Sequence, residues 1–186
     1  MKLQHQFFNQ SFFIPDWNIK HLFLGTFNPM GGENVPYFYA RRRNQTWPIL
    51  SRIFNENFDP YNKDFFNLLK KHELACMDMI ASVEFEDETK LEFIVGKGYS
   101  DSKIINNKVR RGYATENIQS VINKNPNCKV YSTWGHGSKL KEWLFEINKI
   151  SNKTPLVSPS LVAKVPSRVN KSEYIYNDWK SKILLK

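Results

Sequence analysis

The chain has 186 residues and a formal net charge of +9, from 27 lysines and arginines against 18 aspartates and glutamates. A hydrophobic fraction of 41% and a charged fraction of 24% are globular values, which excludes a disordered or fibrous chain. The length fits one domain spanning residues 1–186, and a basic chain with 15% aromatic residues favours a polyanionic partner, with nucleic acid first.

Other absences narrow the protein class further. No apolar run approaches the roughly 18 residues of a membrane helix, and the N-terminus has no secretory signal pattern. We therefore expect a cytoplasmic protein without a membrane partner. Cys76 and Cys128 lie in separate apolar runs, which predicts buried free thiols. Two cysteines and four histidines cannot form a four-cysteine cluster, so we expect no metal and no cofactor.

The first half of the chain predicts two strands separated by helices. The apolar run Ile19–Phe27 predicts a strand that leads into a glycine-containing loop. Thr46–Asn55 has apolar residues at helical spacing, with a proline that suits the first turn. Phe65–Lys71 continues as a helix and leads into a second buried strand at Glu73–Ala81.

The second half repeats this alternation. The Asn170 and Glu173 pair resembles a capping box that opens the last helix. The elements before it are a helix at Thr115–Lys124 capped by Thr115, a strand at Cys128–Trp134, a helix at Ser138–Lys149 and a strand at Thr154–Ser158.

Strands that alternate with helices predict a three-layer α/β/α sandwich around a mainly parallel, four-stranded sheet. Ligands of such sheets bind at the carboxyl ends of the strands. We therefore expect the site in the loops that follow Phe27 and Asp78, in Gly135–Ser138 and in Ser158–Asn170.

Two neighbouring segments have a composition suited to a ligand. Gly25 and the later glycine pair Gly31-Gly32 allow close backbone approach, but neither a P-loop nor a dinucleotide-binding motif is present. The segment Pro36–Trp47 combines three aromatics, three consecutive arginines, an amide and a tryptophan. Arginines neutralise phosphates and aromatic rings stack on unpaired bases, although a solvated charge run beside core aromatics has the same composition.

These two segments resemble the uracil-DNA glycosylase superfamily, and most closely its hypoxanthine-DNA glycosylase branch. Gly25-Thr26-Phe27 is similar to the Gly-Ser-Phe-Pro loop of that branch, and Tyr37–Trp47 ends in Arg-Asn-x-x-Trp where the branch has Arg-Asn-x-Phe-Trp. Further segments match in order over nearly the whole chain: Ala75–Ser82, Tyr99–Ile104, Val130–Lys139 and Leu156–Ser160. The order and spacing of these segments carry the resemblance.

The chain also departs from that pattern. Asn28 lengthens the first loop, which then echoes the Gly-x-Asn-Pro loop of mismatch-specific uracil glycosylases, one residue out of step. Thr46 replaces the expected aromatic, and the loop after Ser158 is longer.

The resemblance implies an enzyme that flips a base out of DNA and hydrolyses its N-glycosidic bond. It assigns the water-positioning amide to Asn44, and the alternative loop alignment assigns it to Asn28. Asp78, which ends an apolar strand, either contacts the base or the water or ties the loop.

The remaining expected site residues fall into two groups. The base pocket is expected to contain Gly25, Thr26, Phe27, Tyr37, Tyr39, His136 and Ser160. DNA binding is expected from Arg41, Arg42, Arg43, Ser158, Pro159, Leu161, Lys164 and Arg168, with Leu161 or Val162 as an apolar wedge or as local core.

The sequence thus predicts a monomeric, monofunctional DNA glycosylase for deaminated bases, hypoxanthine or uracil, whose partner is damaged DNA. No lysine has a clear place in Schiff-base chemistry, so lyase activity is not expected. Two alternatives stay open: a non-catalytic nucleic-acid-binding protein with the same fold, and a hydrolase of free nucleosides or nucleotides.

Overall fold

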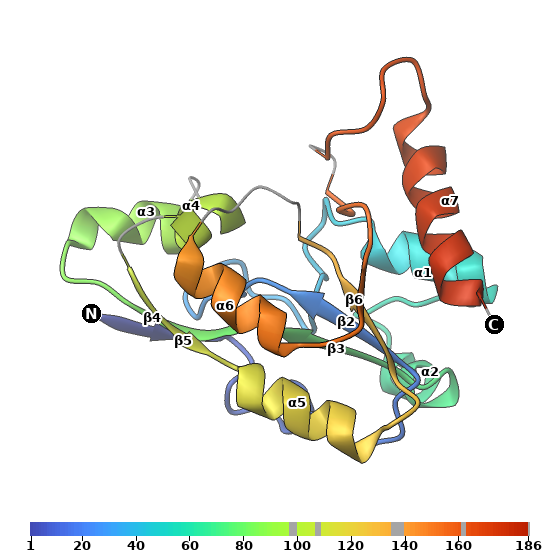
Figure 1. Cartoon of the computed structure of the whole chain (residues 1–186), viewed down its shortest axis with the longest axis horizontal. Coiled ribbons are helices and arrows are strands. Elements are labelled where there is room, and N and C mark those ends of the chain that lie inside the picture. Colours follow the sequence, from blue (N-terminus) through green and yellow to red (C-terminus); the bar gives the residue numbers. More distant parts are fainter. Residues whose placement is uncertain (97–99, 107–108, 135–139, 161–162, 186) are drawn as a thin grey trace.

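The computed structural model describes residues 1–96, 100–106, 109–134, 140–160 and 163–185. Its centre is a four-stranded, all-parallel sheet, which confirms the predicted α/β class (Figure 1). The strands lie in the order β3 (Leu74–Asp78), β2 (His21–Gly25), β6 (Lys129–Ser132) and β7 (Lys153–Pro155).

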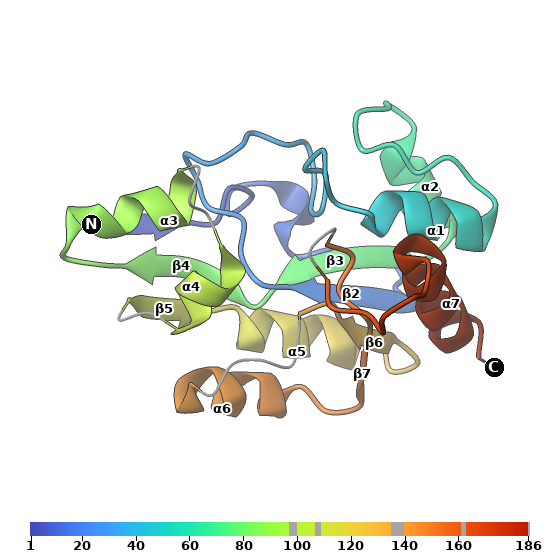
Figure 2. The ribbon, with the colours of Figure 1, turned by 90° about the horizontal axis from the view of Figure 1, so that it is seen from above.

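The predicted three layers are present around this sheet. Figure 2 shows helices α1 and α2 on one side of the sheet and α5 and α6 on the other. All five residues of β2 and of β3 are buried, as expected for parallel strands covered on both faces. The covering helices are α1 (Thr46–Phe54), α2 (Phe65–Lys71) and α7 (Lys171–Leu184) in one core cluster, and α5 (Thr115–Lys124) and α6 (Lys141–Lys149) in the other.

A second, antiparallel sheet was not expected from the sequence. It consists of β1 (Lys2–Gln4), β4 (Ile80–Glu84) and β5 (Arg110–Tyr113). Two helices, α3 (Leu91–Val95) and α4 (Asp101–Asn106), and the short turns η1 (Ser11–Phe13) and η2 (Glu88–Lys90) were also not predicted.

The predicted single strand Glu73–Ala81 is therefore wrong in its extent. The chain stays extended but changes partners at Met79, whose N–H donates to Gly25 O while its carbonyl accepts from Ala114 N. Beyond this residue, β4 pairs with β1 and β5 instead of β2. β4 thus continues along the line of β3 into the second sheet (Figure 2).

The helix starts test two predicted caps. The cap at Asn170 is confirmed, because its Oδ1 accepts the N–H of Glu173 at 3.1 Å. The cap at Thr115 is wrong: Ala114 is the capping residue, and the Thr115 hydroxyl donates to Glu146 across the layer at 2.6 Å. Thr115 is already the first residue of the helix, and its side chain forms a tertiary hydrogen bond instead of a cap.

Both cysteines are free thiols. Cys76 is buried in β3, whereas Cys128 is only partly buried just before β6, so the prediction of two buried thiols is correct only for Cys76. Burial raises the pKa of both thiols, that of Cys128 to about 11. Neither is therefore a thiolate at neutral pH.

Candidate functional site

The carboxyl ends of β2 and β3 meet at Gly25 and Asp78, which pair directly across the two strands. A Cβ added to Gly25 would overlap Asp78 Oδ1 and lie 2.8 Å from Tyr39 Oη. Both oxygens therefore lie directly against the Gly25 backbone, and any side chain at this position would displace them. The structure thus brings three predicted site residues together at the predicted edge of the sheet.

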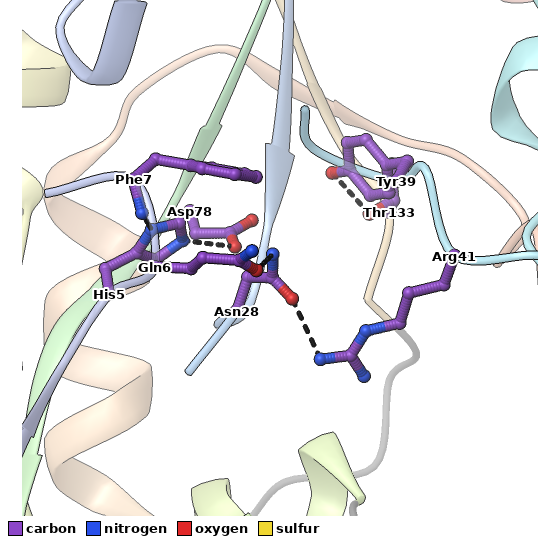
Figure 3. Close-up of polar contacts among 8 residues, drawn as sticks. All are labelled: His5, Gln6, Phe7, Asn28, Tyr39, Arg41, Asp78 and Thr133. Atoms are coloured by element: carbon purple, nitrogen blue, oxygen red, sulfur yellow. Dashed lines mark hydrogen bonds and ion pairs between the residues drawn. The ribbon is translucent and has the colours of Figure 1, made fainter. Parts of the chain in front are cut away.

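Asp78 is held by His5, a residue that was not among the predicted site residues (Figure 3). His5 Nε2 lies 2.9 Å from Asp78 Oδ2, and the two side chains are 0% and 7% exposed. The only sequence signal was a histidine within an aromatic N-terminal segment. Four phenylalanine rings surround the imidazole: Phe7, Phe13, Phe27 and Phe38.

The surroundings of His5 determine which of its nitrogens carries the proton. The backbone N–H of Phe7 donates to His5 Nδ1 at 3.1 Å, so Nδ1 is an acceptor. In the neutral ring the hydrogen is then on Nε2, which donates to Asp78. Both ring nitrogens are occupied, so His5 anchors Asp78 and is not placed to take a proton from a substrate.

Tyr39 reaches the same site from the loop before α1. The Thr133 hydroxyl donates to Leu24 O at 3.0 Å, which leaves its oxygen to accept from Tyr39 Oη at 3.1 Å (Figure 3). Burial raises the pKa of Tyr39 well above its ordinary value, and the nearby Asp78 carboxylate is the next largest cause of this shift. Tyr39 is therefore a neutral phenol whose oxygen lone pairs lie near Gly25. Its positive φ of 58° turns the chain here.

Asn28 links the first loop to the arginine segment. Its Oδ1 accepts from Arg41 Nη2 at 2.8 Å, and its Nδ2 donates to Gln6 Oε1 at 2.9 Å (Figure 3). Because a guanidinium only donates, Arg41 fixes the amide with its oxygen toward the arginine. Both polar atoms of the buried Asn28 amide are thus engaged, the oxygen by Arg41 and the nitrogen by Gln6.

Asn44 lies just before α1 and contacts the last loop. Its Oδ1 accepts the backbone N–H of Thr46 at 2.8 Å, and it forms an isolated antiparallel bridge with Ser160. The next residue, Gln45, donates its backbone N–H to Pro159 O at 3.1 Å. Asn44 Nδ2 makes no hydrogen bond with the residues that the structure describes.

Those predicted DNA-binding residues that the structure describes lie on these two connected loops. Arg42, Arg43, Lys164 and Arg168 are exposed, while Arg41 and Ser158 are partly buried. Pro159 is buried and its carbonyl joins the loops, so its contribution within this structure is to packing. The bridge between Asn44 and Ser160 brings the arginine segment beside the last loop. The predicted site residues His136 and Leu161, together with Val162, lie outside the described residues.

The predicted aromatic residues are not equally accessible. Tyr37 is 0% exposed and packs against core rings including Trp47 and Phe65, so no face of its ring is open. Thr26 and Phe27 are also buried, and Thr26 O accepts the N–H of Ile80. Tyr39 is the predicted aromatic residue of this loop that keeps exposed surface.

Comparison of the chain with protein-family models, curated protein sequences and solved structures found no match. Among the described residues, no three His, Cys, Asp or Glu side chains form a group that could hold a metal ion. Within the same ranges, no helix is both long and apolar enough to cross a membrane.

Proposed function

We propose that this protein is a DNA glycosylase that hydrolyses the N-glycosidic bond of a deaminated base, hypoxanthine or uracil, flipped out of DNA. The observation that carries the proposal is the buried Asp78 carboxylate, which His5 clamps at the carboxyl end of the sheet against Gly25. Open α/β sheets bind their ligands at this edge. The loop that supplies Tyr39 continues directly into three arginines, so a base-binding group and phosphate-binding groups come from one segment.

The residues at this edge have distinct roles in the proposed reaction. The enzyme must first extrude one nucleotide from the base stack. Tyr39 is half-buried beside Gly25 and offers the extruded base a stacking surface, whereas the enclosed Tyr37 supports the loop from below. Bond cleavage then leaves a cation-like sugar and an anionic base, which fixed donors stabilise as the charge develops.

The attacking water requires positioning rather than a strong base, because the bond is largely broken before the water attacks. We assign this role to Asn44. Its Nδ2 has no partner among the described residues, and its Oδ1 is fixed by the Thr46 N–H. Asn28 is less suited to the role, because Gln6 and Arg41 already occupy both polar atoms of its amide. An amide positions water without acting as a base near neutral pH.

A single-turnover assay on single-stranded and duplex oligonucleotides that carry uracil, hypoxanthine or xanthine tests the proposal. We expect an abasic product with hypoxanthine or uracil. Asn44→Ala is expected to lower the rate about 10³-fold while DNA affinity is kept. Asn28→Ala is the matched control and is expected to act mainly on DNA affinity through Arg41.

Three outcomes contradict these assignments. Loss of cleavage in Asn28→Ala but not in Asn44→Ala would move the water to Asn28. DNA binding without any abasic product would make the protein a nucleic-acid-binding module. Cleavage of free nucleosides alone, with affinity insensitive to salt, would make it a nucleoside hydrolase.

A further inference from the structure

The two oxygens of the Asp78 carboxylate are in different situations. Oδ2 accepts from His5 Nε2 at 2.9 Å. Oδ1 makes no hydrogen bond with the described residues and lies against the Cβ-free backbone of Gly25, near Tyr39 Oη. The hydrogen bond between His5 and Asp78, called the clamp below, therefore leaves one carboxylate oxygen available to a ligand. This oxygen has a fixed position on a nearly buried side chain.

Oδ1 is not one of the fully buried polar atoms that lack a partner, so it keeps contact with solvent and a ligand can reach it. On a carboxylate side chain that is only 7% exposed, a ligand N–H that replaces this solvent contact forms a strong, charge-assisted hydrogen bond. Tyr39 does not supply the donor, because its hydroxyl hydrogen is directed to Thr133. The occupant of this position must therefore bring the hydrogen itself.

We propose that His5 is a positioning residue that consumes Oδ2 of Asp78 and so aims Oδ1 as a single acceptor at the ring N–H of the flipped base. The inference rests on the proposed function and names its substrate class: lactam bases, which carry a hydrogen on the ring nitrogen next to the carbonyl. Hypoxanthine carries this hydrogen at N1 and uracil at N3. Purines and pyrimidines with an unprotonated nitrogen at that place direct a lone pair at Oδ1 and are rejected.

The clamp also predicts what a substitution of Asp78 does to this preference. In Asp78→Asn, the His5 N–H still requires an acceptor, so the amide oxygen turns to His5. The amide nitrogen then occupies the position of Oδ1, and the acceptor becomes a donor. This variant is expected to favour bases that have an unprotonated ring nitrogen.

The test measures binding of free bases by calorimetry or NMR, so it does not depend on cleavage. Hypoxanthine carries N1–H. Purine lacks that hydrogen and adds no bulk, and 1-methylhypoxanthine lacks it but keeps the carbonyl. The wild-type protein is expected to bind hypoxanthine about 100-fold more tightly than either analogue. Asp78→Asn is expected to reverse the order of hypoxanthine and purine.

The role of His5 is tested in the same assay with two variants. His5→Phe fits among the surrounding rings but lacks the N–H, and is expected to reduce the preference to within about threefold. His5→Gln retains a side-chain N–H and is expected to restore part of it. His21→Phe, at the other end of β2, is the matched control and is expected to leave the preference unchanged.

Two results separate this inference from the proposed function. Equal binding of hypoxanthine and purine by the wild-type protein overturns the inference, whether or not the protein cleaves DNA. A clear preference that Asp78→Asn reverses supports it even if no lesion is cleaved, in which case the proposed reaction fails. If His5→Phe does not fold, Asp78→Asn still tests the inference. A variant that keeps the preference for hypoxanthine over purine would exclude Asp78 Oδ1 as the acceptor.

Discussion

The two ends of β2 each have a buried histidine, but the partners of these histidines differ. At the amino end, His21 Nδ1 lies 3.0 Å from Tyr131 Oη. At the carboxyl end, His5 Nε2 lies 2.9 Å from the Asp78 carboxylate. His21 is 5% exposed and His5 is 0% exposed, so burial does not distinguish the two positions.

The difference lies in charge and in what remains unpaired. Burial first, and then the charges of Lys20 and Lys129, lower the pKa of His21 from 6.5 to about 4, so it is neutral and faces a neutral phenol. At the other end an acidic group is retained in a nearly buried place with one oxygen open toward Gly25. A buried polar side chain by itself therefore does not distinguish the two ends, and the proposed site rests on a fixed carboxylate oxygen that a ligand can reach.

Removing the polar partner at each end gives the largest expected contrast. Asp78→Ala is expected to lower lesion cleavage at least about 10³-fold, because the acceptor for the base is lost. Tyr131→Phe removes the partner of His21 and is expected to change cleavage less than about twofold. Single-turnover rates at equal folded fraction provide the measurement. Comparable losses in the two variants would show that the two ends do not differ in function.

The low pKa of His21 predicts a specific dependence of stability on pH. Well above pH 6.5 neither the folded nor the unfolded state protonates His21, so its contribution to stability is fully present. As the pH falls from 6.5 toward 4, the unfolded state binds the proton and the folded state does not, and about 3 kcal/mol is lost.

His21→Gln is expected to remove this part of the pH dependence. The free energy of unfolding, measured with urea between pH 7.5 and 4, gives the comparison with the wild-type protein. The same loss of stability in both proteins would mean that His21 is not the titrating group.

A side chain at Gly25 tests how closely the groups at the carboxyl end are packed. Gly25→Ala is expected to lower the free energy of unfolding by about 2 kcal/mol, because its Cβ overlaps Asp78 and crowds Tyr39. Adding Asp78→Ala is expected to recover part of the stability but no activity. Thermal unfolding and cleavage rates together check this, and a stable, active Gly25→Ala protein would contradict the geometry.

The two ends of the sheet also provide matched pairs of cations. Arg42→Ala with Arg43→Ala is expected to weaken DNA binding about tenfold and to reduce the slope of log affinity against log salt by about 1.8. Lys20→Ala with Lys124→Ala removes the same charge from exposed positions near the amino ends of the strands. Titrations at several salt concentrations distinguish the pairs, and equal slopes would mean that DNA does not prefer the proposed face.

Strands that are buried on both faces could be predicted from the sequence, whereas short or partly exposed strands could not. β2 and β3 are buried on both faces, so their sequences are nearly continuous apolar runs, and such runs predict strands. The second sheet had no such signal. β1 has three residues, and β5 is the mainly polar Arg110–Tyr113 with alternate residues exposed, so its pairing depends on β4 being placed first.

By itself the sequence determined the parallel sheet and placed Gly25 and Asp78 near the carboxyl ends of two of its strands. Only the tertiary structure showed that these two strands are neighbours. It also decided which nearby groups complete the site. Tyr37 and Tyr39 are two residues apart, yet one is enclosed by the core and the other reaches Gly25. His5 lies 73 residues from its partner Asp78 in the chain. The local pattern of apolar and polar residues indicates which segments are buried and where strands end. Contacts between distant segments depend instead on how β1, β4 and the loops pack.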